Sequence, residues 1–247
     1  MNITFPVVDM NNASNPVTES TWLYQAQEFI KGVYCDWENG KQTRLVPPVE
    51  DEDVWIQTAK TLGASSERKL IIRLFQLGKR NGLPMFITYN RDFSHLVKTR
   101  NIGGGIEGVL ETGEQDIIII HRDFGVIFIE VKNLDIEQTG KKLGDAVKRN
   151  IKTAEDQLQK DVHSLEHAVK ECGVENMILS LHVIALTNLK RGQLEDISNT
   201  DRTIFLCEED YLSVEAMEQW WQKYVLQLDR VRNFPIDSMT YLQLLAM

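Results

Sequence analysis

Long hydrophobic runs are absent from this chain of 247 residues, whose uninterrupted apolar segments are only a few residues long. A helix that spans a bilayer needs about 20 apolar residues, so no membrane segment is expected. The first residues also lack a basic region followed by an apolar one, which argues against a secretory signal. We therefore expect a soluble intracellular protein, either cytoplasmic or nuclear.

Cysteine is scarce, and the three thiols, Cys35, Cys172 and Cys207, are widely spaced and form no CxxC pair. This argues against a disulfide framework and against a zinc knuckle. Other common signatures are missing too. Gly103-Gly104-Gly105 is not followed by the Lys-Ser/Thr of a phosphate-binding loop, and His163 and His167 lack the glutamate of a His-Glu-x-x-His zinc motif. The simpler interpretation of the three glycines is a flexible loop. For the two histidines it is a solvent-facing or packing role.

Positive charge is in the minority, because 27 lysines and arginines face 36 acids and leave a net charge of −9. This balance argues against a protein that coats nucleic acid nonspecifically. One stretch is an exception, since residues 141–152 contain five basic side chains and one acid. The five are Lys141, Lys142, Lys148, Arg149 and Lys152. Such a stretch is either a solvated helix face or a nucleic-acid contact.

Two short apolar runs, 117–120 and 126–129, stand on either side of the turn-like Arg122-Asp123-Phe124-Gly125. They are rich in β-branched residues, so they predict the two strands of one hairpin. Neither run alternates with polar residues. Both faces of this hairpin should therefore be covered, as in central strands packed between helices.

Three charged residues stand at the ends of these runs: Asp116, Glu130 and Lys132. Side chains alternate along a strand, so Glu130 and Lys132 share one face, roughly 7 Å apart at Cα, and Val131 points away. A carboxylate in such a place costs several kcal/mol or more without a compensating cation or hydrogen bonds. The pattern is that of a metal-dependent hydrolase, with a structural salt bridge as the simpler alternative.

Periodicity and turn signals predict the remaining elements. A helix from 19 to 32 is followed by an acidic cluster, 50–53, that we interpret as a solvated run. Ser65 or Ser66 can cap the next helix, with Glu67 in its first turn. The other expected elements are a strand at 84–88, a helix at 144–171, strands at 178–186 and 203–207, and a helix capped by Ser213 whose aromatic stripe, including Trp220 and Trp221, should be core.

This order of elements, with carboxylates on the hairpin, resembles the PD-(D/E)xK nuclease superfamily, and most closely its nuclease-related domain (NERD) branch. The residues that carry the resemblance are Ser66-Glu67, Glu114-Gln115-Asp116-Ile117-Ile118, Ile127-Phe128-Ile129-Glu130-Val131-Lys132-Asn133 and Ala154-Glu155-Asp156-Gln157-Leu158. The resemblance covers about residues 65–207. It implies a catalytic set of Glu67, Asp116, Glu130 and Lys132, supported by Gln157.

The resemblance also implies an α/β fold with a restriction-endonuclease-like core, a central mixed sheet flanked by helices in the order α-β-β-β-α-β. We expect this core at 64–208, a helical or irregular extension at 1–63, and helices at 209–247 that pack on the core. Asp116 and Glu130 suit Mg²⁺ or Mn²⁺, with the Val131 carbonyl as a further ligand and Glu67 recruiting a second ion.

The expected activity is metal-dependent hydrolysis of phosphodiester bonds in DNA or RNA, in which Lys132 orients the attacking water or stabilises the developing charge. Gln157 would bind the phosphate or orient Lys132. Two other readings stay open. One is a catalytically idle nuclease fold that binds nucleic acid or a protein. The other is a protein-interaction adaptor built around the N-terminal helix and Trp220-Trp221, which would need those aromatic residues exposed as a patch. The acidic net charge leaves open whether the domain works alone, as a homodimer or in a larger assembly.

Overall fold

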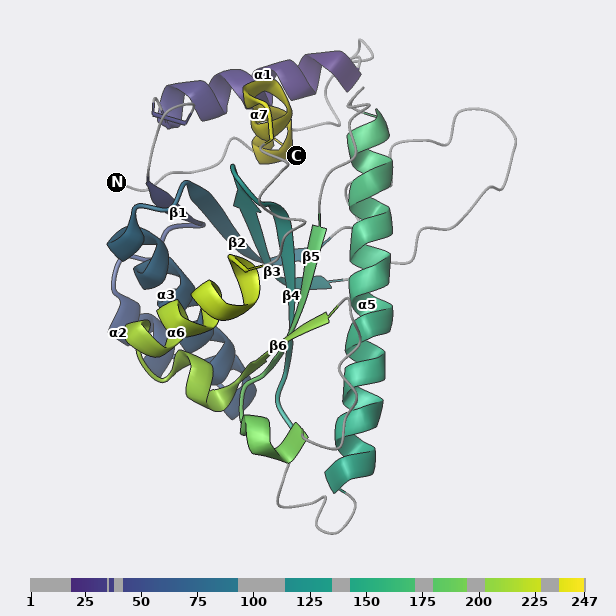
Figure 1. Ribbon diagram of the computed structural model, residues 1–247. Helices are drawn as coiled ribbons and strands as arrows, with labels where there is room; N and C mark the ends of the chain where they lie inside the picture. The colour runs from purple at the N-terminus through teal and green to yellow at the C-terminus, as the bar shows by residue number, and fades with distance from the viewer. Residues whose placement is uncertain are drawn as a thin grey trace, which may run out of the picture.

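In the computed structural model, the chain forms an α/β fold in which one mixed sheet lies between helices (Figure 1). The structure describes residues 19–34, 36–37, 42–92, 114–134, 143–171, 180–194, 203–227 and 236–246. The expectations for Gly103-Gly104-Gly105, Cys35 and Cys172 lie outside these ranges. None of the described helices is long and apolar enough to cross a membrane.

The sheet has six strands in the order β1-β2-β3-β4-β5-β6. Strands β2, β3 and β4 are antiparallel neighbours, whereas β1 pairs with β2, β4 with β5, and β5 with β6 in parallel. The bounds are β1 Thr43–Val46, β2 Met85–Asp92, β3 Glu114–His121, β4 Gly125–Lys132, β5 Ser180–Leu186 and β6 Thr203–Cys207. Strand β1 comes from the segment expected to be an extension, and it was not predicted.

The β3–β4 hairpin is confirmed, with Ile117 opposite Ile129 and Ile120 opposite Val126. Gly125 closes the turn with a φ of 84°, a left-handed conformation that glycine adopts without strain. Strand β4 is buried from Gly125 to Glu130, so its two faces are both covered, as its unbroken apolar run predicts.

One face of the sheet packs against α2 (Glu52–Gln57), α3 (Leu62–Asn81) and α6 (Val214–Trp220), which continues as a π-helical turn (Trp221–Val225). Between the sheet and these helices, odd-numbered residues of β3 and β4 pack against apolar residues of α3. The buried set includes Leu70, Ile71, Leu74, Leu77, Ile117, Ile119, Ile127, Ile129, Trp220 and Trp221. This first core is the larger of the two.

The expected start of α3 was wrong. Thr61, not Ser65 or Ser66, is the N-cap, because its backbone is extended and its side chain accepts a hydrogen bond from the Ala64 N–H. The helix therefore starts earlier, and Glu67 lies in its second turn. The acidic cluster is also more than a solvated run, since Asp51 caps α2 and Glu52 accepts a hydrogen bond from Gln76 on α3.

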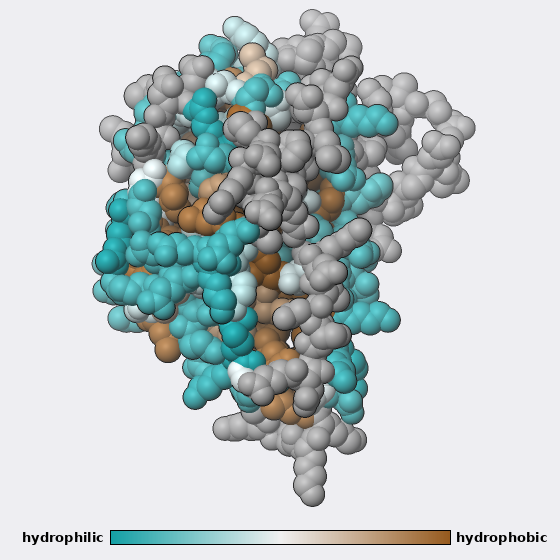
Figure 2. Space-filling view, in the orientation of Figure 1, coloured by the Kyte–Doolittle hydropathy of each residue, from teal (hydrophilic) through white to brown (hydrophobic). Residues whose placement is uncertain are grey.

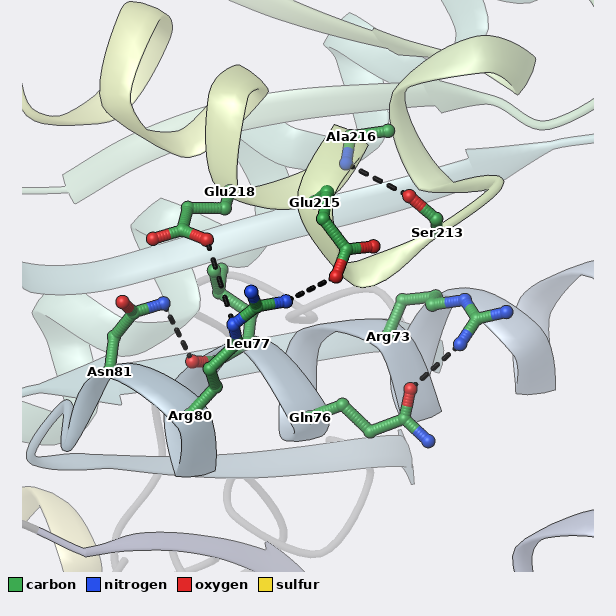
Figure 3. Close-up of polar contacts among 9 residues, drawn as sticks. All are labelled: Arg73, Gln76, Leu77, Arg80, Asn81, Ser213, Glu215, Ala216 and Glu218. Carbon is green, nitrogen blue, oxygen red and sulfur yellow. Dashed lines mark hydrogen bonds and ion pairs between the residues drawn. The ribbon is translucent and has the colours of Figure 1, made fainter.

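Helix α6 is held to α3 at the surface by Arg80, which lies between Glu215 and Glu218 (Figure 3). Ser213 caps α6 by accepting a hydrogen bond from Ala216 N–H at 3.1 Å, as predicted. Arg80 and Glu215 are 50% and 62% exposed. Such an exposed ion pair contributes little, so the packing of α6 depends mainly on its buried side chains.

The opposite face of the sheet is covered by α5 (Leu143–Glu171) and by α7 (Ser238–Ala246), against which α1 (Glu19–Val33) packs (Figure 1). Even-numbered residues of β3 and β4 meet α5 here, in a second core that includes Phe128, Val147, Ile151, Ala154 and Leu158. Phe86 of β2 contacts Tyr241 of α7 and Tyr34 in edge-on ring pairs. These helices follow the residue ranges that periodicity predicts for α1 and α5.

Trp220 and Trp221 are each 2% exposed, so the adaptor reading, which needs them on the surface, was wrong. Trp220 donates a hydrogen bond from Nε1 to the Phe205 carbonyl at 2.9 Å. Figure 2 shows hydrophilic residues over the outer sides of α5 and of the helices across the sheet, with hydrophobic residues between them. The aromatic stripe of α6 belongs to the core because its helical spacing turns it toward the sheet.

Candidate active site

Asp116, Glu130 and Lys132 lie on the face of the sheet that α5 covers. The alternation of side chains places them with their even-numbered neighbours, Ile118 and Phe128, which pack in the second core. Glu130 is 5% exposed. The alternation of side chains along the strands therefore turns the three charged side chains toward α5, together with the apolar residues on that face.

Glu130 and Lys132 form an ion pair in which Lys132 Nζ donates to Glu130 Oε1 at 2.5 Å. The other carboxylate oxygen, Oε2, is buried and has no hydrogen-bond partner among the residues that the structure describes. A buried acceptor without a partner is unfavourable by about 1–3 kcal/mol, and more when it is charged. One oxygen of Glu130 is therefore satisfied by Lys132, whereas no described residue satisfies the other.

The side chain of Asp116 is hydrogen-bonded to the same end of β4. Its Oδ2 accepts a hydrogen bond from the Val131 N–H at 2.7 Å, so the backbone between Glu130 and Lys132 lies beside it. The Val131 side chain packs on the opposite face, in the first core. Val131 thus contributes its main-chain N–H to the cluster, whereas the role predicted for it was that of a metal ligand through its carbonyl.

The neighbouring strand is distorted at this point. The β2–β3 pairing passes from Tyr89–Ile117 to Arg91–Gln115, and Asn90, opposite Asp116, has a φ of 50°. A positive φ is uncommon outside glycine, and asparagine is among the residues that tolerate it best. Such conformations gather at functional sites, where the surrounding structure maintains them.

The electrostatic setting of Glu130 favours its protonated form. Burial raises its pKa to about 7 and the negative charge of Asp116 acts in the same direction, while the hydrogen bond and charge of Lys132 oppose them. A like charge nearby and a low-dielectric environment both disfavour the ionised carboxylate. A raised pKa in a buried carboxyl group beside a second acid is typical of functional sites.

A third acid, Asp161, was missed by the sequence analysis. It lies on α5 at 3% exposure, and its Oδ1 accepts a hydrogen bond from Gln157 Nε2 at 3.1 Å. Burial and the charges of Glu130 and Asp116 raise its pKa to about 7, against the Gln157 hydrogen bond and the Lys132 charge. The signal in the sequence was its i+4 spacing from Gln157, on the side of the helix that carries Leu158 and Leu165.

The structure thus brings together Asp116, Glu130 and Lys132, with Gln157 beside them through Asp161. Glu67 is placed differently, because its helix, α3, covers the other face of the sheet. Near it, Ser66 accepts a long hydrogen bond, 3.5 Å, from Asn133, the residue that follows Lys132. Glu67 is therefore close to the end of β4, but Asp116 and Lys132 are the charges that shift the pKa of Glu130.

Asn133 and its neighbours brace the end of β4. Asn133 Nδ2 also donates to Thr187 Oγ1 at 3.2 Å, and the Tyr211 hydroxyl donates to the Thr187 carbonyl at 2.5 Å. These contacts join α3, β4, β5 and the 3₁₀ turn Glu208–Tyr211. They fix the main chain directly after Lys132, which limits where its side chain can reach.

Two lysines of the basic stretch, Lys148 and Lys152, point away from this cluster. Lys148, Arg149 and Lys152 are exposed on α5. At 3.6 residues per turn, Lys148 and Lys152 lie about 180° and about 140° around the helix from Gln157. Lys141 and Lys142 lie outside the described residues, as does the side chain of His167, while His163 is exposed on α5.

A divalent cation fits the chemistry of the cluster. In the part of the chain that the structure describes, no three His, Cys, Asp or Glu side chains form a ready-made metal group. Mg²⁺, however, is usually held by one or two carboxylates, with waters and substrate phosphates as its other ligands. Asp116 and Glu130 supply two carboxylates, and Oε2 of Glu130 has no hydrogen-bond partner in the described part of the chain.

Comparison with known proteins assigns the chain to no family, because no family model, no curated protein and no solved structure matches it.

Proposed function

We propose that the chain is a metal-dependent nuclease of the PD-(D/E)xK type, which hydrolyses phosphodiester bonds of DNA or RNA. The order α3-β2-β3-β4-α5-β5 and the position of Asp, Glu-x-Lys on β3 and β4 support this proposal. The resemblance stated for the sequence rests on the same residues. The restriction-endonuclease-like core that this resemblance implies is also part of the proposal.

The observation that carries the proposal is a group of buried acids beside a lysine. Among the described residues, Asp116, Glu130 and Asp161 influence one another electrostatically, and Lys132 lies with them. Acids that raise one another's pKa in this way are typical of functional sites, and a divalent cation would stabilise their ionised forms.

Asp116 and Glu130 are the residues that would hold Mg²⁺ or Mn²⁺, with the Val131 carbonyl and Glu67 as further candidate ligands. When bound, such a cation polarises a phosphoryl oxygen and lowers the pKa of a bound water. Lys132 orients the attacking water or stabilises charge that develops on the phosphoryl group. Lys148, Arg149 and Lys152, with Lys141 and Lys142, remain candidates for phosphate contacts.

The test is a cleavage assay on single- and double-stranded DNA and RNA with Mg²⁺ or Mn²⁺. Asp116→Asn keeps an acceptor for the Val131 N–H but removes the charge, and Lys132→Ala removes the ammonium. Each should abolish cleavage without unfolding the protein. Matched controls are Asp156→Asn and Lys170→Ala, two exposed positions on α5 that should cleave like the wild type.

The alternative is a catalytically idle nuclease fold that binds nucleic acid or a protein partner. The ion pair between Lys132 and Glu130 favours this alternative, because it neutralises one of the two candidate ligands. Absence of cleavage by the wild type with either metal on all four substrates, together with measurable nucleic-acid binding, would replace the nuclease by this module.

A further inference from the structure

Asp161 is a carboxylate placed where the sequence pattern of α5 calls for an apolar side chain. Leu158 precedes it and Val169 follows it on the buried side of the helix, and both belong to the second core. At 3% exposure, Asp161 is as buried as these neighbours. Burying a charge is strongly unfavourable unless it is paired, so a purely structural role would be served better by an apolar residue.

Its partners are those of the candidate site. Across the interface with the sheet, Asp161 is within electrostatic range of Glu130, Asp116 and Lys132. Along its own helix it accepts the hydrogen bond from Gln157. Asp161 therefore joins Gln157 to the Asp116–Glu130 pair, although it lies 31 residues beyond Glu130 in the sequence.

The direction of the hydrogen bond also orients the Gln157 amide. Nε2 must face Asp161, because an ionised carboxylate can only accept. The carbonyl oxygen of Gln157 is then turned to the other side of the amide, where it can accept from a water or an ammonium. Asp161 thereby biases Gln157 toward orienting Lys132 or a water, the second of the two roles expected for it.

We propose that Asp161 is a positioning residue of this site, which fixes the Gln157 amide and whose charge strengthens the binding of a divalent cation by Asp116 and Glu130. The inference rests on the proposed metal site and adds a residue outside the motif that suggested it. Carboxylates that orient other site groups are typical of metal centres, where their loss weakens metal binding by about 10- to 100-fold.

The experiment is a calorimetric titration of the metal-free full chain with Mn²⁺, together with the Mn²⁺-dependent rise in Tm. Asp161→Ala removes both the charge and the acceptor for Gln157, and should weaken Mn²⁺ binding by about 10- to 100-fold. Asp161→Asn keeps an acceptor oxygen and removes only the charge, so its loss should be smaller. Asp156→Asn, an exposed position on the same helix, should bind Mn²⁺ like the wild type.

The outcomes are distinguishable. Wild-type Mn²⁺ affinity in both Asp161 variants would overturn the inference and leave the metal site standing. Absence of Mn²⁺ binding by the wild type would overturn the metal site and this inference together. Mn²⁺ binding that weakens as expected in the variants, in a protein that cleaves no nucleic acid, would support Asp161 and refute the nuclease. A far-ultraviolet circular dichroism spectrum confirms that each variant is folded.

Discussion

The two ends of the β3–β4 hairpin both bury ionisable side chains, but they do so in opposite ways. At the turn end, His121 is fully buried and stacks on Phe124, with ring centroids 4.2 Å apart, near Trp221. At the open end, Glu130 lies with Asp116 and Lys132 beneath α5. The same two strands thus hold a neutral aromatic cluster at one end and a charged cluster at the other.

Burial shifts the pKa at each end in the direction that favours the neutral form. It lowers the pKa of His121 to about 3, so the imidazole is neutral at physiological pH, and its Nδ1 accepts a hydrogen bond from the Asp123 N–H. It raises the pKa of Glu130 and of Asp161 to about 7, where the carboxyl groups are still partly ionised. The turn end therefore holds a neutral imidazole among aromatic rings, and the open end keeps a repulsion between acids that a functional site can use.

The largest effect should come from the turn end. Trp221→Ala removes a side chain that is 2% exposed and contacts His121 and Phe124. The cavity should lower the free energy of unfolding by about 3–5 kcal/mol, measured by denaturant unfolding. Leu212→Ala, at a residue that is 65% exposed, is the control and should change it little. A loss in Trp221→Ala no larger than in the control would show that the aromatic cluster is not a stabilising core.

At the open end of the hairpin, a substitution should stabilise the protein rather than destabilise it. Asp161→Asn in the metal-free protein at pH 8 removes one of three repelling charges, keeps the side-chain shape and should raise the free energy of unfolding by about 0.5–2 kcal/mol. At pH 5 the gain should be smaller, because the carboxyl group is already protonated in the folded chain while it is still ionised in the unfolded chain. Asp156→Asn is the matched control at both pH values. Destabilisation at pH 8 would mean that Asp161 is a structural residue.

The two ends of the β3–β4 hairpin should also contribute in opposite directions to the pH dependence of the free energy of unfolding. Between its ordinary pKa of about 4 and its folded value of about 7, each buried acid binds more protons in the folded than in the unfolded chain, so stability falls as pH rises. His121 does the opposite between about 3 and 6.5, because the unfolded chain binds the extra proton, and stability rises with pH.

These contributions can be separated by measuring the free energy of unfolding of metal-free variants from pH 4 to pH 8. The double variant Glu130→Gln/Asp161→Asn should show mainly the rise due to His121. His121→Phe should steepen the fall due to the acids. A profile that none of these substitutions changes would mean that the pKa shifts at both ends are small.

The smallest effect should come from a charged pair that is not buried. Arg80→Ala breaks the exposed ion pairs with Glu215 and Glu218 (Figure 3). Because water already solvates both partners, the midpoint of denaturant unfolding should match that of the wild type within error. A clear shift would contradict the view that burial, rather than charge alone, makes the open end of the hairpin unusual.

Much of this fold could be predicted because the signals are local. The two apolar runs around a turn predict the hairpin, and the helical spacing of Val147, Ile151, Ala154 and Leu158 predicts α5 and its buried side. The alternation of side chains also predicts that Glu130 and Lys132 share a face, which their ion pair confirms. These inferences need only the periods of a strand and a helix.

The start of α3 and the strand β1 could not be predicted in this way. A helix start depends on which hydroxyl accepts the hydrogen bond, and Thr61 and Ser65 are chemically equivalent candidates in the sequence. Strand β1 has four residues, too few for a period, and pairs with β2 across 42 positions of sequence.

By itself, then, the sequence determined which residues share a face: Glu130 with Lys132 on β4, and Gln157 with Asp161 on α5. Only the tertiary structure decided that these two faces meet, that α3 lies across the sheet, and that Lys148 and Lys152 turn away from the acids. The physical reason is that periodicity is a property of one element, whereas the packing of two elements depends on the volumes and charges of both surfaces at once.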